Sequence, residues 1–442
     1  MLSLSFDFAA VFSLLNIHNF GVSTLQKSAK FDLILYGATG FTGKLTAAYL
    51  DRHPELVGRR WAIAGRNAAA LKALQATLTS QQVEVVTCPL NDAAAVEAMV
   101  QSTHVVITTA GPYSTYDGDK LLGACARAGV HYSDLSGEGF WQREMIDQYH
   151  EIARVSGAKI VLGGGVDSIP SDLGAYMALK GIGLETPNAE SSESSESSES
   201  SESKESIQLT GVYKEYSGSF SGGTLASGKA REAAIKSGRL TRNALCDPYV
   251  LAPGTQRAET ECSTLDGMPH KFRYQKDEKI GVLLPFFMAK INAPVVRRSL
   301  ALQGLAGNVT YRECCSPGMW FKVAWLYISR GLGYPLGESI NFKPKSGQGP
   351  PKWMLTQGAF KAEITAQTPD GRTAKAIISG KGDPGYGATS KMLSEVALCL
   401  INDHQKQPSN AGVLTPATAM GQTLIERLNA ADNGTFMQLY IA

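Results

Sequence analysis

Short apolar runs alternate with segments of helical periodicity over the first third of the chain. Six apolar runs predict buried strands: Phe31–Gly37, Trp61–Arg66, Val83–Leu90, His104–Gly111, His131–Leu135 and Lys159–Gly163. Five segments between them predict helices: Lys44–His53, Asn67–Leu78, Asn91–Gln101, Gly118–Ala128 and Glu138–Ser156. This alternation is typical of an α/β fold with a doubly wound parallel sheet, in the strand order 3-2-1-4-5-6.

The pattern changes after Asp172, which suggests a second domain. Strands are predicted at Gln208–Tyr213, Lys361–Gln367 and Lys375–Ser379, and a helix from Thr224 to about Lys236. We therefore expect a nucleotide-binding domain over residues 31–172 and an α+β substrate domain over residues 173–382. Residues 383–442 are expected to form a C-terminal helical segment, with a helix at Ser390–Asn402, that packs back on the first domain.

Three segments stand apart from this pattern. Residues 1–30 form an N-terminal extension without the basic residues of a secretory signal. Residues 190–206 are a Ser/Glu repeat, which cannot form a core and is expected to be disordered. The run Ile280–Ala289 is strongly apolar but too short to span a bilayer, so it predicts either buried core or a surface that contacts lipid or acyl chains.

A glycine-rich loop joins the first strand to the first helix. It reads Gly37, Ala38, Thr39, Gly40, Phe41, Thr42, Gly43. Glycines at this spacing let the backbone turn tightly and approach a pyrophosphate, whose charge lies at the helix N-terminus. Because the loop follows a strand and begins a six-strand series, it predicts a dinucleotide site formed by Gly37, Thr39, Gly40, Phe41, Thr42 and Gly43.

The end of the second strand indicates which dinucleotide binds. An enzyme that prefers NAD usually has a carboxylate there, whereas this chain has Arg66 followed by Asn67. A guanidinium can pair with a 2′-phosphate, so Arg66 favours NADP(H). Asp92, after the third strand, is placed either to approach the adenine or to cap a helix.

Two further segments follow strands at the edge where ligands bind in such sheets. Ala110, Gly111, Pro112 and Tyr113 follow the fourth strand, and Tyr113 is either a proton donor or a structural tyrosine. A glycine triplet, Gly163–Gly165, follows the sixth strand and precedes Asp167 and Ser168. These two residues either cap a helix begun by Pro170 or face the nicotinamide.

Charge and cysteine content exclude several classes of function. The net charge of the chain is +2. The Ser/Glu repeat alone carries −5, so the rest of the chain carries +7 and is mildly basic. That surplus suits a phosphate-bearing ligand and is far from the basic face of a nucleic-acid binder. The seven cysteines form no metal-binding or disulfide pattern, so we expect no metal and a reducing compartment.

Five motifs together resemble the saccharopine dehydrogenase-like oxidoreductases, in the branch that contains the trans-acting enoyl reductases of bacterial lipid pathways. They are YGATGFTG, TTAGPY, GGGVDSIPSD, SGGTLASG and GDPGYGATSKMLSEVAL. The resemblance implies a Rossmann domain, NADP(H), and reduction of a lipid or polyketide-like acyl intermediate. It also implies that Ala110–Tyr113 and Gly165–Ser168 line the reactive end of the cofactor. The resemblance also implies association with lipid droplets or membranes, as for members of that branch.

The leading hypothesis is an NADPH-dependent enoyl reductase, with Tyr113, Asp167 and Ser168 as catalytic candidates. Two alternatives stay open: a saccharopine-type imine reductase, and a lipid-associated protein that binds the nucleotide without turnover. The expected partner is a small-molecule or carrier-bound acyl substrate, with a homodimer and peripheral lipid or membrane association as further alternatives. The expected location is the cytoplasm, with lipid droplets or a membrane surface as alternatives.

Overall fold

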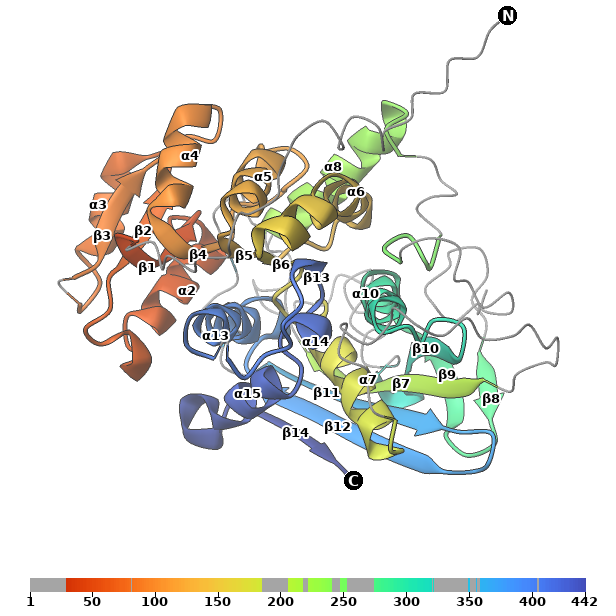
Figure 1. The fold of residues 1–442 in the computed structure, drawn as a ribbon. Coiled ribbons are helices and arrows are strands. Elements are labelled where there is room, and N and C mark those ends of the chain that lie inside the picture. The colour runs from red at the N-terminus through yellow and green to blue at the C-terminus, as the bar shows by residue number, and fades with distance from the viewer. Residues whose placement is uncertain are drawn as a thin grey trace, which may run out of the picture.

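A computed structural model describes residues 29–80, 82–184, 206–217, 222–240, 247–252, 274–319, 321, 349, 355, 358–403 and 405–442. The N-terminal extension, except for its last two residues, lies outside the described residues, and so does the Ser/Glu repeat, except for Ser206. The described residues form two seven-stranded sheets joined by helices (Figure 1).

The first sheet is entirely parallel, in the order β13-β6-β5-β4-β1-β2-β3. Its strands are β1 (Phe31–Tyr36), β2 (Trp61–Gly65), β3 (Glu84–Thr87), β4 (Thr103–Thr108), β5 (His131–Ser133), β6 (Lys159–Val161) and β13 (Gly412–Leu414). The predicted order of the first six strands is confirmed, and the predicted fold class with it. The seventh strand comes from the C-terminal segment and extends the sheet beyond β6.

Helices cover both faces of this sheet. They are α2 (Phe41–Leu50), α3 (Ala68–Gln75), α4 (Ala93–Gln101), α5 (Gly118–Ala128), α6 (Gly139–Ser156) and, from the C-terminal segment, α13 (Thr389–Asn402). Helix α13 packs against α2 and against strands β1, β4 and β5. Its inner side chains, Met392, Leu393 and Val396, are fully buried, because the helix lies between the parallel sheet and the rest of the molecule.

The second sheet is mixed, in the order β14-β12-β11-β7-β10-β9-β8. Its strands are β7 (Ile207–Ser217), β8 (Gln275–Asp277), β9 (Gly281–Pro285), β10 (Val309–Cys315), β11 (Ala359–Gln367), β12 (Thr373–Lys381) and β14 (Met437–Ile441). The remaining helices are α7 (Ile169–Gly181), α8 (Gly222–Lys236), α10 (Ala289–Leu302), α14 (Pro416–Ala419) and α15 (Gln422–Gly434).

Helix α7 connects the two sheets. It follows β6 and crosses strands β11 and β12 of the second sheet (Figure 1). A Cβ at Gly174 would lie 2.3 Å from a methyl carbon of Ile364 and 2.6 Å from one of Ile378. Only glycine allows the helix to approach the sheet this closely, and side chains from both sheets share one apolar core around it.

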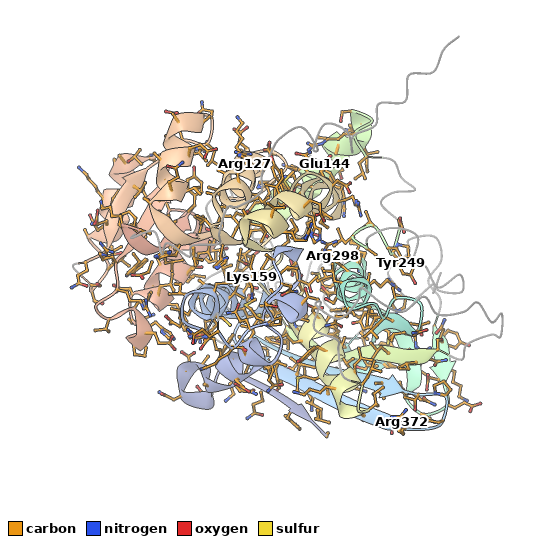
Figure 2. The ribbon with its side chains drawn as sticks, viewed as in Figure 1. Arg127, Glu144, Lys159, Tyr249, Arg298 and Arg372 are labelled. Carbon is orange, nitrogen blue, oxygen red and sulfur yellow. The ribbon has the colours of Figure 1, made fainter. Side chains whose placement is uncertain are left out.

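The sequence suggested a helical C-terminal segment, but the segment also contains two strands. It adds β13 to the first sheet and β14 to the second. Two buried cations hold the backbone of this segment near β13 (Figure 2). Lys159 donates to the carbonyl oxygens of Pro408 and Ala419 at 2.7 and 3.1 Å. Arg298 donates to the carbonyl oxygen of Val413 and, outside the segment, to that of Leu251 at 2.7 Å. These carbonyls satisfy buried donors that water cannot reach.

Candidate functional site

The glycine loop after β1 has the geometry of a pyrophosphate cradle. Gly37 has φ +77°, and a Cβ there would lie 2.8 Å from the Ala110 nitrogen. A Cβ at Gly43 would lie 2.3 Å from the Gly37 carbonyl oxygen, so the loop folds directly onto α2. Gly40 precedes the helix and no side chain caps it, while Thr39 remains partly exposed. The first-turn amides are therefore available to an anion, and this loop fits a dinucleotide.

Arg66 lies where a 2′-phosphate site is expected. It follows β2, is exposed, and has its guanidinium carbon 5.9 Å from the ring centroid of Tyr116. Within the part of the chain that the structure describes, no hydrogen bond or ion pair occupies the guanidinium of Arg66. Asp92 accepts from the Ala95 amide at 3.0 Å and is the N-cap of α4, as one of its two interpretations predicted.

Ala110 to Tyr113 follow β4, and the Tyr113 hydroxyl is fully engaged. It donates to the Thr108 carbonyl oxygen and accepts from the Leu135 amide, both at 3.0 Å. Its ring stacks on Trp141 with centroids 5.4 Å apart. Burial raises the pKa of Tyr113 well above its ordinary value. These contacts favour the structural interpretation of Tyr113 over a role as proton donor.

Glu138, which sequence reasoning missed, holds this segment in place. Its buried carboxylate accepts from the backbone nitrogens of Tyr113 and Ser114 at 2.9 and 3.3 Å, and from the Ser114 hydroxyl. It also accepts from the Ser227 hydroxyl at 3.3 Å, which ties α8 to the first domain. The acidic residue directly before the helix Gly139–Ser156 was the only signal in the sequence.

The glycine triplet after β6 passes between serine hydroxyls. A Cβ at Gly163 would lie 2.4 Å from the Ser168 Oγ, and one at Gly164 would lie 2.5 Å from the Ser133 Oγ. The Asp134 carboxylate accepts from the Gly163 amide at 3.0 Å and fixes the turn. The Ser168 Oγ is buried, and the described residues offer it no hydrogen-bond partner.

Asp167 is the least satisfied carboxyl group near this loop. Ser168 occupies the N-cap position of α7, as one of the two interpretations predicted, but its side chain makes no capping hydrogen bond. Asp167 forms no hydrogen bond or ion pair within the described ranges of the chain. Burial raises the pKa of Asp167 to about 6, because the ionised form loses hydration without gaining a partner. A carboxyl group with such a pKa can transfer protons near neutral pH.

A third segment, from Gly382 to Ser390, joins the two loops. The Thr389 hydroxyl accepts from the Val166 amide at 3.1 Å and donates to the Pro384 carbonyl oxygen at 2.7 Å. The Tyr386 ring meets the Phe41 ring edge-on with centroids 5.3 Å apart. Three sequence motifs therefore meet at the carboxyl edge of the parallel sheet, where ligands bind in such folds.

The apolar run Ile280–Ala289 forms β9 and the turn before α10. Phe286 is 1% exposed and stacks on Tyr213 with ring centroids 4.1 Å apart, so it belongs to the core. Phe287 is 39% exposed, and its ring meets the Phe286 ring edge-on with centroids 5.0 Å apart. The buried-core alternative therefore holds for Phe286, and contact with lipid or acyl chains stays a prediction for the exposed Phe287.

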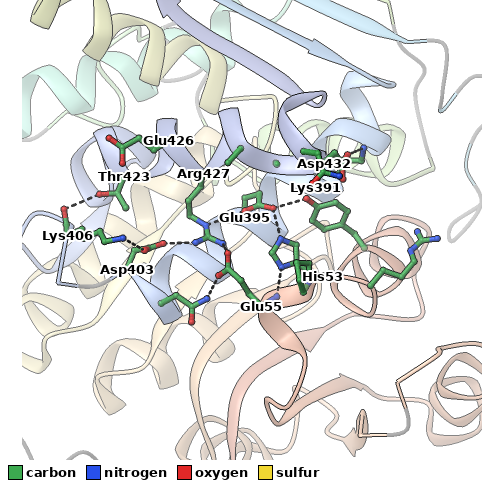
Figure 3. Close-up of a pocket in the computed structure, with 17 residues that line it drawn as sticks. His53, Glu55, Lys391, Glu395, Asp403, Lys406, Thr423, Glu426, Arg427 and Asp432 are labelled. Atoms are coloured by element: carbon green, nitrogen blue, oxygen red, sulfur yellow. Dashed lines mark hydrogen bonds and ion pairs between the residues drawn. The ribbon is translucent and has the colours of Figure 1, made fainter.

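A surface pocket of about 830 Å³ lies elsewhere, at the far end of α2, and contains none of the predicted site residues (Figure 3). Its charged side chains are largely paired with one another. Arg427 contacts the carboxylates of Glu55, Asp403 and Glu395 at 2.8, 2.7 and 3.3 Å. This network joins α13 and α15 to the end of α2, which indicates a structural role.

The chain has extensive similarity to known proteins. A family model for the saccharopine dehydrogenase NADP binding domain matches residues 33–161. Trans-acting enoyl reductases of Mycobacterium leprae and Mycobacterium bovis are each 32% identical, over 91% of this chain and 96% of their own. A protein of Mycobacterium tuberculosis, given the same activity provisionally in its name, is 36% identical over 91% of this chain and 96% of its own.

Among solved structures, apo saccharopine dehydrogenase (L-Glu forming) from Saccharomyces cerevisiae aligns with 93% of this chain and 100% of its own. The identity is 11% and the TM-score 0.47. Among the residues described above, no helix is long and apolar enough to cross a membrane.

Proposed function

The chain belongs to the trans-acting enoyl reductase family and is an NADP(H)-dependent oxidoreductase, and from this premise we propose that it reduces the α,β-double bond of an acyl thioester. The main support for this proposal is the similarity to these relatives over 91% of the chain. The unpaired carboxyl of Asp167, beside the meeting point of the three motifs, supplies chemistry that suits this reaction.

The residues that would bind the cofactor have different roles. Gly37, Gly40 and Gly43 leave room for the pyrophosphate, and Arg66 supplies the charge that a 2′-phosphate requires. When bound, NADPH would supply the hydride that the β-carbon of the substrate receives. The buried hydroxyl of Ser168 has no hydrogen-bond partner among the described residues, and a polar group of a bound ligand would satisfy it.

Asp167 completes the reduction as the proton donor. Addition of hydride at the β-carbon moves the π-electron pair to the α-carbon and the carbonyl oxygen, which forms an enolate. The protonated Asp167 then transfers its proton to the α-carbon, and the remaining carboxylate recovers a proton from water. Burial raises the pKa of Asp167 to about 6, so a fraction of this acid is still protonated near neutral pH and can donate its proton.

The nature of the acyl group forms part of the proposal. Lipid or polyketide-like chains attached to a carrier are the expected substrates, and the names of the relatives give the enoyl reduction alone. Val282 and Phe287 are 41% and 39% exposed on β9 and the turn after it, and they offer apolar contact to a chain or to a lipid surface. Homodimer formation and lipid association are secondary proposals, testable by light scattering and by flotation with vesicles.

The test is NADPH oxidation with trans-2-dodecenoyl-N-acetylcysteamine thioester, followed by mass spectrometry of the product. We expect consumption of one NADPH per saturated thioester formed, and loss of at least about a hundredfold in rate for Asp167→Asn. Oxidation only with an imine of an amino acid and an aldehyde would replace this proposal by a saccharopine-type reductase. NADPH binding without oxidation by either compound would favour a protein without turnover.

A further inference from the structure

Strand β7 contains an irregularity that changes the direction of one tyrosine. In its antiparallel pairing with β11, Lys361 lies opposite Glu215 but Ala362 lies opposite Tyr213. Lys214 is therefore an extra residue, which makes this a β-bulge. In a regular strand, Tyr213 and Tyr216 would point to opposite faces, because side chains alternate. The bulge brings both to the same face.

Ring contacts confirm this shared orientation. The Tyr213 and Tyr216 centroids are 6.2 Å apart, and both rings contact Phe286, at 4.1 and 5.7 Å. Tyr216 also meets Phe287 edge-on at 5.4 Å. Bulges commonly occur beside active sites, where they redirect a side chain.

This face of the sheet meets the loop that bears Asp167. A Cβ at Gly137 would lie 3.5 Å from the Asp167 Oδ2 and 3.4 Å from Ile291, and Ile291 packs on the same apolar cluster as Tyr216. Ser171, one helical turn after Asp167, hydrogen-bonds the Tyr213 hydroxyl at 2.8 Å. The beginning of α7 and the bulged end of β7 are therefore neighbours.

Among Tyr113, Tyr213 and Tyr216, the first two hydroxyls form hydrogen bonds with described residues and the third does not. The Tyr113 hydroxyl is bonded to backbone groups, and the Tyr213 hydroxyl is bonded to Ser171 and, at 3.5 Å, to Asn292. The Tyr216 hydroxyl makes no hydrogen bond with any residue in the described ranges. Burial first, and then the charge of Asp167, raises the pKa of Tyr216 well above its ordinary value. Its proton therefore stays in place and can be donated in a hydrogen bond.

We propose that Tyr216 is a further catalytic residue, whose hydroxyl donates a hydrogen bond to the carbonyl oxygen of the acyl thioester as the enolate forms. This inference rests on the proposed enoyl reduction. Tyr216 stabilises the negative charge on oxygen, and Asp167 gives its proton to the α-carbon. Tyr216 therefore donates a hydrogen bond and Asp167 donates a proton, and neither residue can take over the task of the other. A hydrogen-bond donor placed at a developing oxyanion commonly contributes about 10²–10³ in kcat.

The test uses acetoacetyl-N-acetylcysteamine thioester with the protein saturated with NADP⁺, because this compound forms an enolate without any hydride transfer. Asp167 accepts the α-proton and Tyr216 holds the oxygen, so ultraviolet absorbance should show bound enolate. Tyr216→Phe should bind at least about tenfold less enolate, while its melting temperature and NADPH affinity stay unchanged. Tyr440→Phe, which changes an exposed tyrosine on the edge strand β14, is the matched control and should behave as wild type.

Failure of this inference and failure of the proposed function are distinguishable. Equal enolate absorbance in Tyr216→Phe and wild type would overturn the role of Tyr216. A wild-type protein that shows no enolate absorbance would overturn it as well. Enolate formation by a wild-type protein that reduces no enoyl thioester would instead overturn the proposed function and support Tyr216 as an oxyanion donor. For the active enzyme, Tyr216→Phe should lower kcat about 10²–10³-fold with little change in KM.

Discussion

The guanidinium carbon of Arg66 lies 5.9 Å from the ring centroid of Tyr116, and both side chains are exposed beside the carboxyl edge of the parallel sheet. This contact orients a cation at the end of β2, where a carboxylate would indicate NAD. A 2′-phosphate can approach this cation, because no described carboxylate is paired with it.

Arg66→Ala should therefore weaken binding of NADPH but hardly affect NADH. A charge-assisted hydrogen bond contributes about 1.5–3 kcal/mol, which corresponds to roughly ten- to more than a hundredfold in affinity. Fluorescence titration of both cofactors measures this difference. Arg154→Ala, an exposed arginine on α6, is the control. An equal loss of affinity for both cofactors would mean that Arg66 stabilises the fold and does not bind the 2′-phosphate.

Gly37→Ala should abolish tight NADPH binding. Its Cβ would collide with the Ala110 nitrogen at 2.8 Å, and its φ of +77° disfavours any side chain. Gly58→Ala is a matched control, because Gly58 has φ +80° but no atom within 4 Å of the added carbon. Both variants should lose about 1–2 kcal/mol of stability from backbone strain. Retention of NADPH affinity by Gly37→Ala would contradict the cradle.

The proton-transfer step should slow as the pH rises above about 6, because burial raises the pKa of Asp167 to about 6 and the acid must be protonated. The single-turnover rate should fall about tenfold per pH unit beyond that point, and the residual activity of Asp167→Asn should be flat. Rapid mixing at a series of pH values measures it. An identical profile in Asp167→Asn would exclude this residue as the acid.

The same shift has a consequence for stability. The pKa of Asp167 is higher in the folded protein than in the unfolded chain, so the folded state loses stability as the pH rises from about 4 through 6. Asp167→Asn should therefore be more stable than wild type at pH 7 by about 1–3 kcal/mol, and nearly equal to it at pH 4. Urea denaturation at the two pH values tests the sign.

Two adjacent phenylalanines should respond differently to truncation. Phe286→Ala should lower the free energy of unfolding by about 3–5 kcal/mol, because its ring is buried against Tyr213. Phe287→Ala should leave stability within about 1 kcal/mol and raise the KM for a dodecenoyl thioester, but not for a crotonyl thioester. Urea denaturation and steady-state kinetics separate the two effects. A dodecenoyl KM that Phe287→Ala leaves unchanged would remove this residue from the acyl contact.

Much of the first domain was predictable, because its signals are local. Six apolar runs sufficed for the order of six strands, and the glycine spacing sufficed for the tight turn at Gly37. Strand β13 was not predictable, since three residues, Gly412–Leu414, carry no periodicity and pair with a strand far away in sequence. The bulge at Lys214 depends on its pairing with β11, so β7 alone cannot reveal it.

The chemistry of single residues was less predictable than the fold. The sequence placed Tyr113 after a strand, but only the packed structure shows that Thr108 and Leu135 occupy its hydroxyl. Glu138 and Tyr216 belong to no recognised motif, and their importance comes from neighbours distant in sequence. A polar side chain becomes reactive through what surrounds it, and that environment is a product of tertiary structure.

The position of β13 has a consequence for biosynthesis. A ribosome delivers the chain from its N-terminus, so β6 emerges long before its neighbour Gly412–Leu414 is made. Until then the nascent parallel sheet exposes an unpaired edge, and the carbonyls that satisfy Lys159 are absent. The nucleotide-binding domain therefore cannot reach its final state during translation, and a stop codon before residue 412 should yield a product that aggregates instead of a functional fragment.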